Sequence, residues 1–339
     1  MGRPRLQDVA ARAGVSLATA SRVLNGSSRT PAPALVERVR AAAAELGYVV
    51  NAQAQALAKA RTGLLGLVVQ DISDPYFSSI AAGAQAQARP HGLQLLLAST
   101  DRDPAAEREA VDAFAAHRAD AIVVVGTRWT GDDDAALAEA LGRYAAAGGR
   151  AVVVGQPLGE AAVVRPPNAP GSRALAEALL GQGHRRFVVV TGPDRVVTAR
   201  ERADAFTAAA EAGGGHVEPA VVAGQFSRDG GYGAAAEVTR LARDGAGRPC
   251  VFAVTDVMAI GLIAGLRDAG LAVPRDVLVA GFDDIPTLRD HVPALTTVRV
   301  PLEEIGRRAV LVALGEADEA GEADPALATQ VLLRESTGG

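Results

Sequence analysis

The chain has 339 residues, a formal net charge of −5 and 49% hydrophobic against 22% charged residues, which suffices for two or three domains with cores of their own. Its single cysteine, Cys250, excludes a disulfide framework and a metal site built on cysteines. Because the N-terminus lacks a charged lead into a long apolar run, and no apolar stretch approaches the ~20 residues of a membrane span, we expect a cytoplasmic protein with neither signal peptide nor membrane contact.

Residues 6–25 predict two short helices joined by a tight turn. In the first helix, apolar residues recur at helical spacing and form one stripe: Leu6, Val9, Ala10 and Ala13. Gly14 suits the left-handed backbone that often ends a helix, and Ser16 suits the cap of the next one. The second helix would bury Ala20, Val23 and Leu24. Two helices arranged in this way are typical of a helix-turn-helix.

The exposed face of the second helix carries hydroxyls, an amide, a guanidinium and two apolar side chains at its start: Leu17, Ala18, Thr19, Ser21, Arg22 and Asn25. Such groups reach phosphates and base edges in the major groove of DNA. Arg22 is the best candidate for a guanine contact, because its fork matches two acceptors of that base. Leu17 and Ala18 can touch a thymine methyl, whereas the hydroxyls and the Asn25 amide suit phosphate oxygens.

Charge separates this first segment from the rest of the chain. Residues 1–61 hold nine basic and three acidic side chains, a net charge of +6; since the whole chain carries −5, the remainder carries about −11. A basic head on an acidic body is typical of a nucleic-acid-binding module. The charge therefore favours double-stranded DNA as the partner over the alternative, a helical hairpin packed on a larger domain. A single head reads few base pairs, so we expect a homodimer on a near-palindromic operator.

From residue 64 onward, runs rich in β-branched residues alternate with alanine-rich helical stretches. The predicted strands are 64–69, 93–98, 121–125, 151–154, 187–190, 251–254 and 277–280. The predicted helices include 81–89, 104–116, 175–182, 199–212 and 258–269. Buried parallel strands that alternate with helices indicate a doubly wound α/β fold. Because these units are too many for one small lobe, we expect two similar lobes.

Two N-terminal segments resemble the LacI/GalR family of bacterial transcription regulators: D-V-A-A-R-A-G-V-S-x-A-T-x-S-R-V-L-N at 8–25 and L-G-Y-V-V-N-A-Q-A-Q-A-L-A-K-A-R-T at 46–62. The resemblance implies an all-α helix-turn-helix domain over 1–50, a hinge helix and linker over 51–62, and an effector-binding and dimerisation core over 63–339. This α/β core would consist of two doubly wound lobes like those of a periplasmic sugar-binding protein, joined by three crossovers with a ligand cleft between them.

The resemblance also gives the hinge a role. In the family this helix folds on the operator, where Leu57 would enter the minor groove as an apolar wedge. An alanine-rich segment this short is marginal as an isolated helix, which fits folding on DNA. Gln55 departs from the arginine that many members carry. The predicted DNA-binding residues are therefore Ser16, Leu17, Ala18, Thr19, Ser21, Arg22, Asn25 and Leu57.

Segments of the core resemble the family's effector site. D-I-S-D-P-Y-F at 71–77 places aromatic rings beside a carboxylate, which suits a sugar; the alternative there is a capped helix start with both rings in the core. T-A-R-E-R-A-D-A-F at 198–206 contains the arginine that binds effector in the family, and V-A-G-F-D-D-I-P at 279–286 contains the cleft aspartate. The predicted effector-binding residues are Asp74, Tyr76, Phe77, Arg202, Phe226, Thr255, Asp256 and Asp283.

Other features of the sequence limit the possible functions. Thr255 replaces an asparagine of the family and Gly155 an aspartate, so a non-sugar effector or a corepressor is the alternative to a sugar. Residues 231–236 spell the dinucleotide fingerprint G-x-G-x-x-A, but a polar run separates them from the preceding strand, which argues against a nucleotide-using enzyme. We expect no catalysis, no cofactor and no metal, and the DNA-binding head argues against a transport-type binding protein. The sequence thus predicts an effector-controlled DNA-binding regulator, a repressor of genes for carbohydrate use.

Overall fold

The computed structural model describes residues 4–25, 31–49, 61–129, 134–245 and 247–338. The chain divides into two compact units, Met1–Gly63 and Leu64–Gly339, each with its own hydrophobic core. The predicted wedge Leu57 and its neighbour Gln55 lie outside the described residues, as does the side chain of Asn25. None of the described helices combines the length and the apolar character that crossing a bilayer requires.

The described residues of the first unit form three helices: α1 Leu6–Ala13, α2 Leu17–Asn25 and α3 Pro33–Glu45. Small and branched side chains from all three form its core: Val9, Ala10, Ala13, Ala20, Val39, Ala42 and Ala43. Gly14 ends α1 with a φ of 62°, the left-handed conformation that the turn requires. The Ser16 hydroxyl accepts a hydrogen bond from the Thr19 N–H at 3.2 Å and caps α2. The predicted helix-turn-helix is confirmed.

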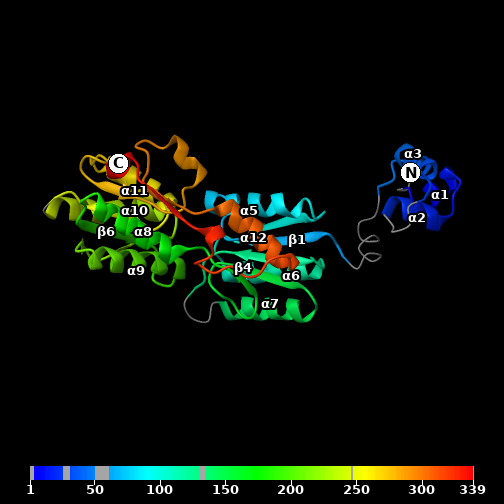
Figure 1. Ribbon diagram of the computed structural model, residues 1–339, viewed down its shortest axis with the longest axis horizontal. Helices are drawn as coiled ribbons and strands as arrows, with labels where there is room; N and C mark the ends of the chain where they lie inside the picture. Colours follow the sequence, from blue (N-terminus) through cyan, green and yellow to red (C-terminus); the bar gives the residue numbers. More distant parts are fainter. Residues whose placement is uncertain (1–3, 26–30, 50–60, 130–133, 246, 339) are drawn as a thin grey trace. The chain divides into compact units, whose positions relative to one another are not determined.

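The first lobe of the second unit is built on a parallel sheet in the order β2-β1-β3-β4-β5 (Figure 1). Its strands are β1 Leu64–Val69, β2 Gln94–Ser99, β3 Ala121–Val125, β4 Arg150–Val154 and β5 Ala162–Val164. Its helices are α5 Pro75–Ala88, α6 Pro104–Ala116, α7 Ala135–Ala146 and α12 Leu302–Leu314. Successive strand residues face opposite sides of the sheet. Leu67 and Val123 pack on the side of α5 and α12, whereas Val68 and Val124 pack on the side of α6 and α7.

The second lobe repeats this arrangement around a sheet in the order β10-β9-β6-β7, with β8 also paired to β6. Its strands are β6 Arg186–Thr191, β7 His216–Val217, β8 Val221–Val222, β9 Cys250–Ala253 and β10 Leu278–Ala280. Its helices are α8 Asn168–Gly181, α9 Val197–Ala212, α10 Arg228–Asp244 and α11 Asp256–Asp268. Its core includes the contacting rings of Phe187, Phe206 and Phe252. The predicted fold, a helical head and a core of two doubly wound lobes, is confirmed.

The chain crosses between the lobes three times: after β5, between β10 and α12, and after α12. Near the crossovers, β11 Thr297–Arg299 pairs antiparallel with β12 Gln330–Leu332. Short 3-10 helices, η2 Pro286–Asp290, η3 Pro325–Leu327 and η4 Glu335–Thr337, complete the chain. Figure 1 places α12 beside α5 in the first lobe and the C-terminus in the second.

The main differences from the sequence prediction concern short or capped elements. Helix α5 begins at Pro75 instead of residue 81, because the Asp74 carboxylate accepts the Tyr76 N–H at 3.0 Å and caps it. Helix α7 and strand β5 were not predicted. Strands of two or three residues, such as β5 and β7, carry too few alternations to be recognised in a sequence.

Helices α5 and α12 pack with their backbones close together. A Cβ atom at Gly83 would overlap the Glu303 carbonyl, and one at Gly306 would overlap the Ile80 carbonyl. Backbone atoms cannot move aside as a flexible side chain can, so these two positions require glycine. This contact fixes α12, which follows one crossover and precedes another, onto the first lobe.

We predict that Gly83→Ala lowers the free energy of unfolding by about 1–3 kcal/mol, because the added methyl group overpacks the contact with α12. Gly142→Ala is the matched control: it also lies within a helix of the first lobe, is exposed, and has no described atom within 4 Å of the added Cβ. The control should raise the free energy of unfolding by about 0.5–1 kcal/mol. Urea denaturation measures both, and equal effects would contradict the packing argument.

Candidate functional site

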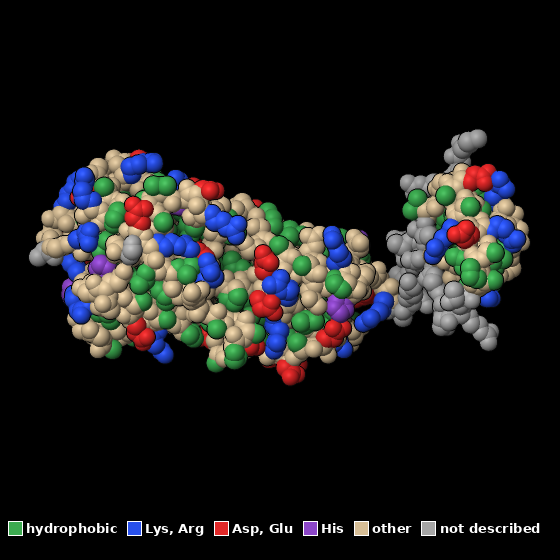
Figure 2. Space-filling view, turned by 45° about the horizontal axis from the view of Figure 1, so that its top comes forward, with side chains coloured by type: hydrophobic (Ala, Val, Ile, Leu, Met, Phe, Trp, Pro, Cys, Tyr) green, Lys and Arg blue, Asp and Glu red, His purple; other side chains and the backbone are tan. Residues whose placement is uncertain are grey.

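Helix α2 exposes most of the side chains predicted to contact DNA. Leu17 is 48% exposed, and Ala18 and Arg22 are exposed beside it. Thr19 and Ser21 are half-buried, and the Thr19 hydroxyl hydrogen-bonds to that of the cap residue at 2.8 Å. Figure 2 shows arginine side chains spread over the visible face of this unit, with fewer acidic ones. The helix therefore presents a guanidinium and small side chains on the face that its core packing leaves free.

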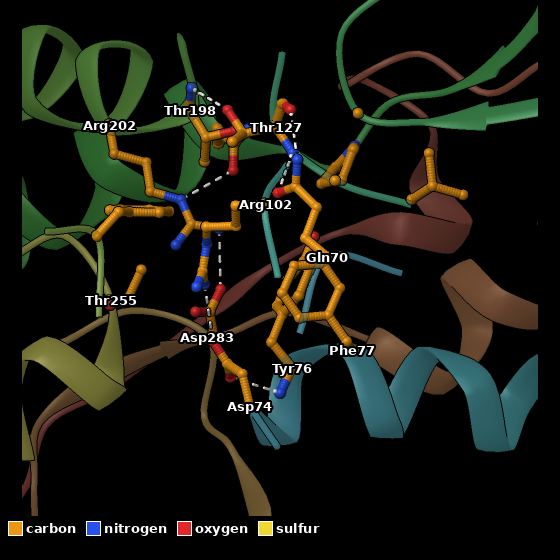
Figure 3. Close-up of a pocket in the computed structure, with 16 residues that line it drawn as sticks. Gln70, Asp74, Tyr76, Phe77, Arg102, Thr127, Thr198, Arg202, Thr255 and Asp283 are labelled. Carbon is orange, nitrogen blue, oxygen red and sulfur yellow. Dashed lines mark hydrogen bonds and ion pairs between the residues drawn. The ribbon is translucent and has the colours of Figure 1, made fainter. Parts of the chain in front are cut away.

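A pocket lies between the two lobes, where the carboxyl ends of their strands meet. From the first lobe it is lined by Gln70, Asp74, Tyr76, Phe77, Arg102, Gly126, Thr127, Val154 and Gly155. From the second lobe and the first crossover it is lined by Pro166, Asn168, Thr198, Arg202, Phe226, Thr255 and Asp283. The structure thus brings together the predicted effector-binding residues, except Asp256 (Figure 3).

All three guanidinium nitrogens of Arg202 donate hydrogen bonds within the second lobe and the first crossover. Its Nη2 donates to Asp283 at 2.9 Å, its Nε to Asn168 at 2.9 Å and its Nη1 to the Val254 carbonyl at 2.9 Å. Its guanidinium carbon also lies 4.0 Å from the centre of the Phe282 ring. Arg202 and Asp283 are both buried; burial raises the pKa of the Asp283 carboxyl group, and the adjacent guanidinium opposes that rise. The three hydrogen bonds therefore hold the guanidinium in one position and orientation.

The residues at the start of α5 combine the two roles that the sequence allowed: they cap the helix, and they line the pocket with aromatic rings. The Asp74 side chain caps the helix, and burial raises the pKa of its carboxyl group. Tyr76 and Phe77 pack edge to face with ring centres 5.1 Å apart, and both line the pocket. Burial also raises the pKa of the Tyr76 phenol, which therefore stays protonated at neutral pH. The cap fixes the direction of α5, and this direction places the rings of Tyr76 and Phe77 at the pocket (Figure 3).

Asp256, a predicted effector-binding residue, lies within the second lobe instead of on the pocket. Its Oδ1 accepts the Thr297 hydroxyl at 2.6 Å and its Oδ2 accepts the Ile285 N–H at 3.0 Å. Burial raises its pKa to about 7. These bonds fix the turn in which Asp283 and Asp284 have φ values of 119° and 54°, unfavourable for residues other than glycine. Asp256 therefore positions Asp283.

Polar contacts between the lobes surround the pocket, and the sequence analysis did not identify them. The Thr198 N–H donates to the Thr127 hydroxyl at 3.0 Å, and the Val197 N–H donates to the Arg128 carbonyl at 3.1 Å. Gln156, after β4, donates to Thr198 at 3.1 Å and to Glu201 at 3.0 Å. The only feature of the sequence that indicated these contacts was the position of Thr127 and Gln156 just beyond predicted strands.

A buried ion cluster holds the first-lobe side of these contacts. The guanidinium of Arg128 lies 3.0 Å from the Glu107 carboxylate and 3.2 Å from that of Asp134. The Gln70 amide donates hydrogen bonds both to Glu107 and to the Thr127 carbonyl. Because these side chains belong to separate segments of one lobe, they fix residues 126–129, which follow β3. Thr127 and Arg128 in turn contact the N-terminus of α9, the helix that carries Arg202.

The side chains pack the pocket closely. Its free volume is about 40 Å³, room for a few water molecules, whereas pockets for drug-sized ligands measure roughly 300–1,000 Å³. A ligand of sugar size therefore requires side chains to move or the lobes to separate. The arrangement can bind a small polar molecule through charged groups and aromatic rings from both lobes.

Two parts of the chain match known families. Residues 5–51 match bacterial regulatory proteins of the lacI family, and residues 176–337 match the periplasmic binding protein-like domain. The HTH-type transcriptional regulator CelR of Thermobifida fusca is 33% identical over 315 residues, which cover 90% of this chain and 89% of CelR.

Solved structures show the same likeness. The transcriptional regulator CelR–cellobiose complex is 30% identical, with a TM-score of 0.68 over 98% of this chain and 100% of that one. The Lac repressor dimer bound to operator and the anti-inducer ONPF shares the fold at 24% identity, with a TM-score of 0.82 over 99% of each chain. The relatives named here are transcriptional regulators and not enzymes. The predicted family is confirmed: the chain belongs to the LacI family of bacterial regulatory proteins and is a DNA-binding transcriptional regulator.

Proposed function

We propose that the protein is a repressor that binds a near-palindromic operator as a homodimer, and that a sugar bound between the core lobes controls its affinity for DNA. The observation that carries the proposal is the pocket, which places the Arg202–Asp283 pair and the rings of Tyr76, Phe77 and Phe226 at the junction of two lobes. A small ligand at such a junction contacts both lobes. It thereby changes the relative stability of two arrangements of the lobes.

The pocket chemistry suits neighbouring hydroxyl groups. A carboxylate such as Asp283 accepts hydrogen bonds from hydroxyls, and a guanidinium donates to them. Aromatic rings cover an apolar face of a small polar ligand. Support for a sugar also comes from the CelR–cellobiose complex, a structure of a relative with a sugar bound. A non-sugar effector is the outcome to consider if no sugar binds.

In the head, we assign base contacts to Arg22, Leu17 and Ala18, and phosphate contacts to Ser16, Thr19, Ser21 and Asn25. The support is the exposure of Leu17, Ala18 and Arg22 on one face of α2. Two heads related by a two-fold axis would read two half-sites, which requires a homodimer. We retain the division of the chain into a DNA-binding domain (1–50), a hinge (51–62) with Leu57 as its minor-groove wedge, and a core (63–339).

The mechanism is thermodynamic linkage between the two ligands. The effector prefers one arrangement of the lobes, the lobes set the geometry of the hinge, and the hinge sets the affinity for operator. A coupling of roughly 1–3 kcal/mol changes that affinity about 5–150-fold. The proposal is tested by titrating the full-length protein on its own upstream intergenic DNA with a panel of sugars at fixed salt. Release of DNA by one sugar is the expected result; specific binding that no sugar changes would exclude a sugar effector.

We predict that Arg22→Ala lowers the preference for operator over random DNA by about 1–3 kcal/mol, because a bidentate contact with one base is lost. Arg40→Ala, which removes an exposed arginine of α3, serves as the control and should leave that preference unchanged. Competition binding at several salt concentrations measures the effect. A uniform loss on all sequences, with a salt slope reduced by about one, would assign Arg22 to phosphate instead.

We predict that Arg202→Ala abolishes the response to effector while operator binding persists, because the substitution removes the central donor of the pocket but leaves the head intact. Arg200→Ala is the matched control, since Arg200 is exposed on the same helix two residues away. Operator binding with and without the inducing sugar measures both. Loss of operator binding by Arg202→Ala, with circular dichroism unchanged, would contradict this division of roles.

A further inference from the structure

The pocket contains a second arginine whose contacts differ from those of Arg202. Arg102 lies in the turn between β2 and α6, with its Nη1 3.5 Å from Asp71 and its Nη2 3.7 Å from Asp74. These distances exceed those of good charge-assisted hydrogen bonds. Its Nε is buried without a hydrogen-bond partner. Arg202 makes three hydrogen bonds, so the two guanidinium groups are held with very different firmness.

Arg102 lies between aromatic rings of the two lobes. Its guanidinium carbon is 6.0 Å from the centre of the Phe77 ring in the first lobe and 5.9 Å from that of Phe226 in the second. Both distances reach the limit of a cation–π attraction. Because Arg102 belongs to the first lobe, its contact with Phe226 joins the lobes. The same two rings are the apolar surfaces against which the ring of a sugar would stack.

The backbone aims this side chain at the pocket. Asp101 and Arg102 have φ values of 51° and 62°, which non-glycine residues adopt at a cost, and such conformations cluster at functional sites. The turn is fixed by hydrogen bonds from the Arg102 N–H to the Gln70 carbonyl and from the Asp103 N–H to the Thr100 carbonyl. The alternative, a surface ion pair, does not fit, because the Arg102 side chain is only 18% exposed and lines the pocket.

We propose that Arg102 is a built-in competitor of the effector: its guanidinium fills the place between Phe77 and Phe226 and holds the lobes together until a sugar displaces it. The inference rests on the proposed function of the pocket as the effector site. The apparent affinity for effector is then the intrinsic affinity multiplied by the fraction of molecules in which Arg102 has left that place. Removal of Arg102 should therefore loosen the lobes in the absence of sugar and tighten the binding of sugar.

The chain carries its own reporter of lobe separation. Trp129 is its single tryptophan and pairs across the lobes with Val196, while the Arg195 guanidinium carbon lies 4.6 Å from the centre of its ring. Separation of the lobes exposes the indole to a quencher in solution. Arg102→Gly and Arg102→Asn are the variants of choice, because both residues tolerate the left-handed backbone at this position. Arg108→Ala is the control, since Arg108 forms an outer ion pair with Asp112 in the same lobe.

In full-length protein without added sugar, both Arg102 variants should raise the acrylamide quenching constant of Trp129 roughly twofold or more, and the Arg108→Ala control should not. Unchanged quenching in both Arg102 variants would overturn the proposal. With cellobiose as the probe in isothermal titration calorimetry, the dissociation constant should fall about three- to tenfold in both variants. Weaker binding than in the control would identify Arg102 as a direct ligand contact and also overturn the proposal.

The two readouts separate this inference from the proposed function. If the wild-type protein binds neither cellobiose nor any other sugar of the panel, the sugar assignment fails. Quenching of Trp129, which requires no ligand, still decides whether Arg102 holds the lobes together.

Discussion

The buried guanidinium of Arg202 is the contact on which the site depends. Removing this charge from water is costly, and it is offset by the Asp283 carboxylate, the Asn168 amide and the Val254 carbonyl together. These partners come from the first crossover, the end of β9 and the turn that Asp256 holds. One charge therefore fixes three segments that are far apart in the sequence. Each of these segments is therefore needed to stabilise the buried guanidinium.

Contacts between the lobes are of another kind. The hydrogen bonds from Val197 to Arg128, from Thr198 to Thr127 and from Gln156 to Thr198 join neutral groups around the pocket, so each contributes only about 0.5–1.5 kcal/mol. Their sum is of the same order as the roughly 1–3 kcal/mol by which two sites are typically coupled. Such an interface can exchange its internal partners for those of a ligand without unfolding either lobe. The first-lobe side of this interface is held by the buried ion cluster of Arg128, Glu107 and Asp134.

Much of the fold could be predicted because its signals are local. The helix-turn-helix follows from a spacing of apolar residues with Gly14 and Ser16 between them, and long strands such as β1 follow from runs of branched residues. The pocket was harder, because its members come from strand ends that only the tertiary structure brings together. Asp256 illustrates the difference: its position in the sequence suggests a ligand contact, whereas Thr297 and Ile285 occupy its oxygens. Arg102 was not recognised because a single arginine in a polar turn is indistinguishable from a surface residue.

In the proposed mechanism, the two arginines of the pocket divide recognition from switching. A side chain with all its donors satisfied, as in Arg202, presents the same geometry to every ligand and so supplies specificity. A side chain with long contacts and an unpartnered Nε, as in Arg102, can leave its place at little cost. Since a ligand shifts an equilibrium only by its differential affinity for two states, a regulator needs a contact that the ligand replaces. A pocket in which no contact is replaced would bind effector without shifting the equilibrium between two arrangements of the lobes, so in this proposal control depends on the weakly held arginine as well as on the strongly held one.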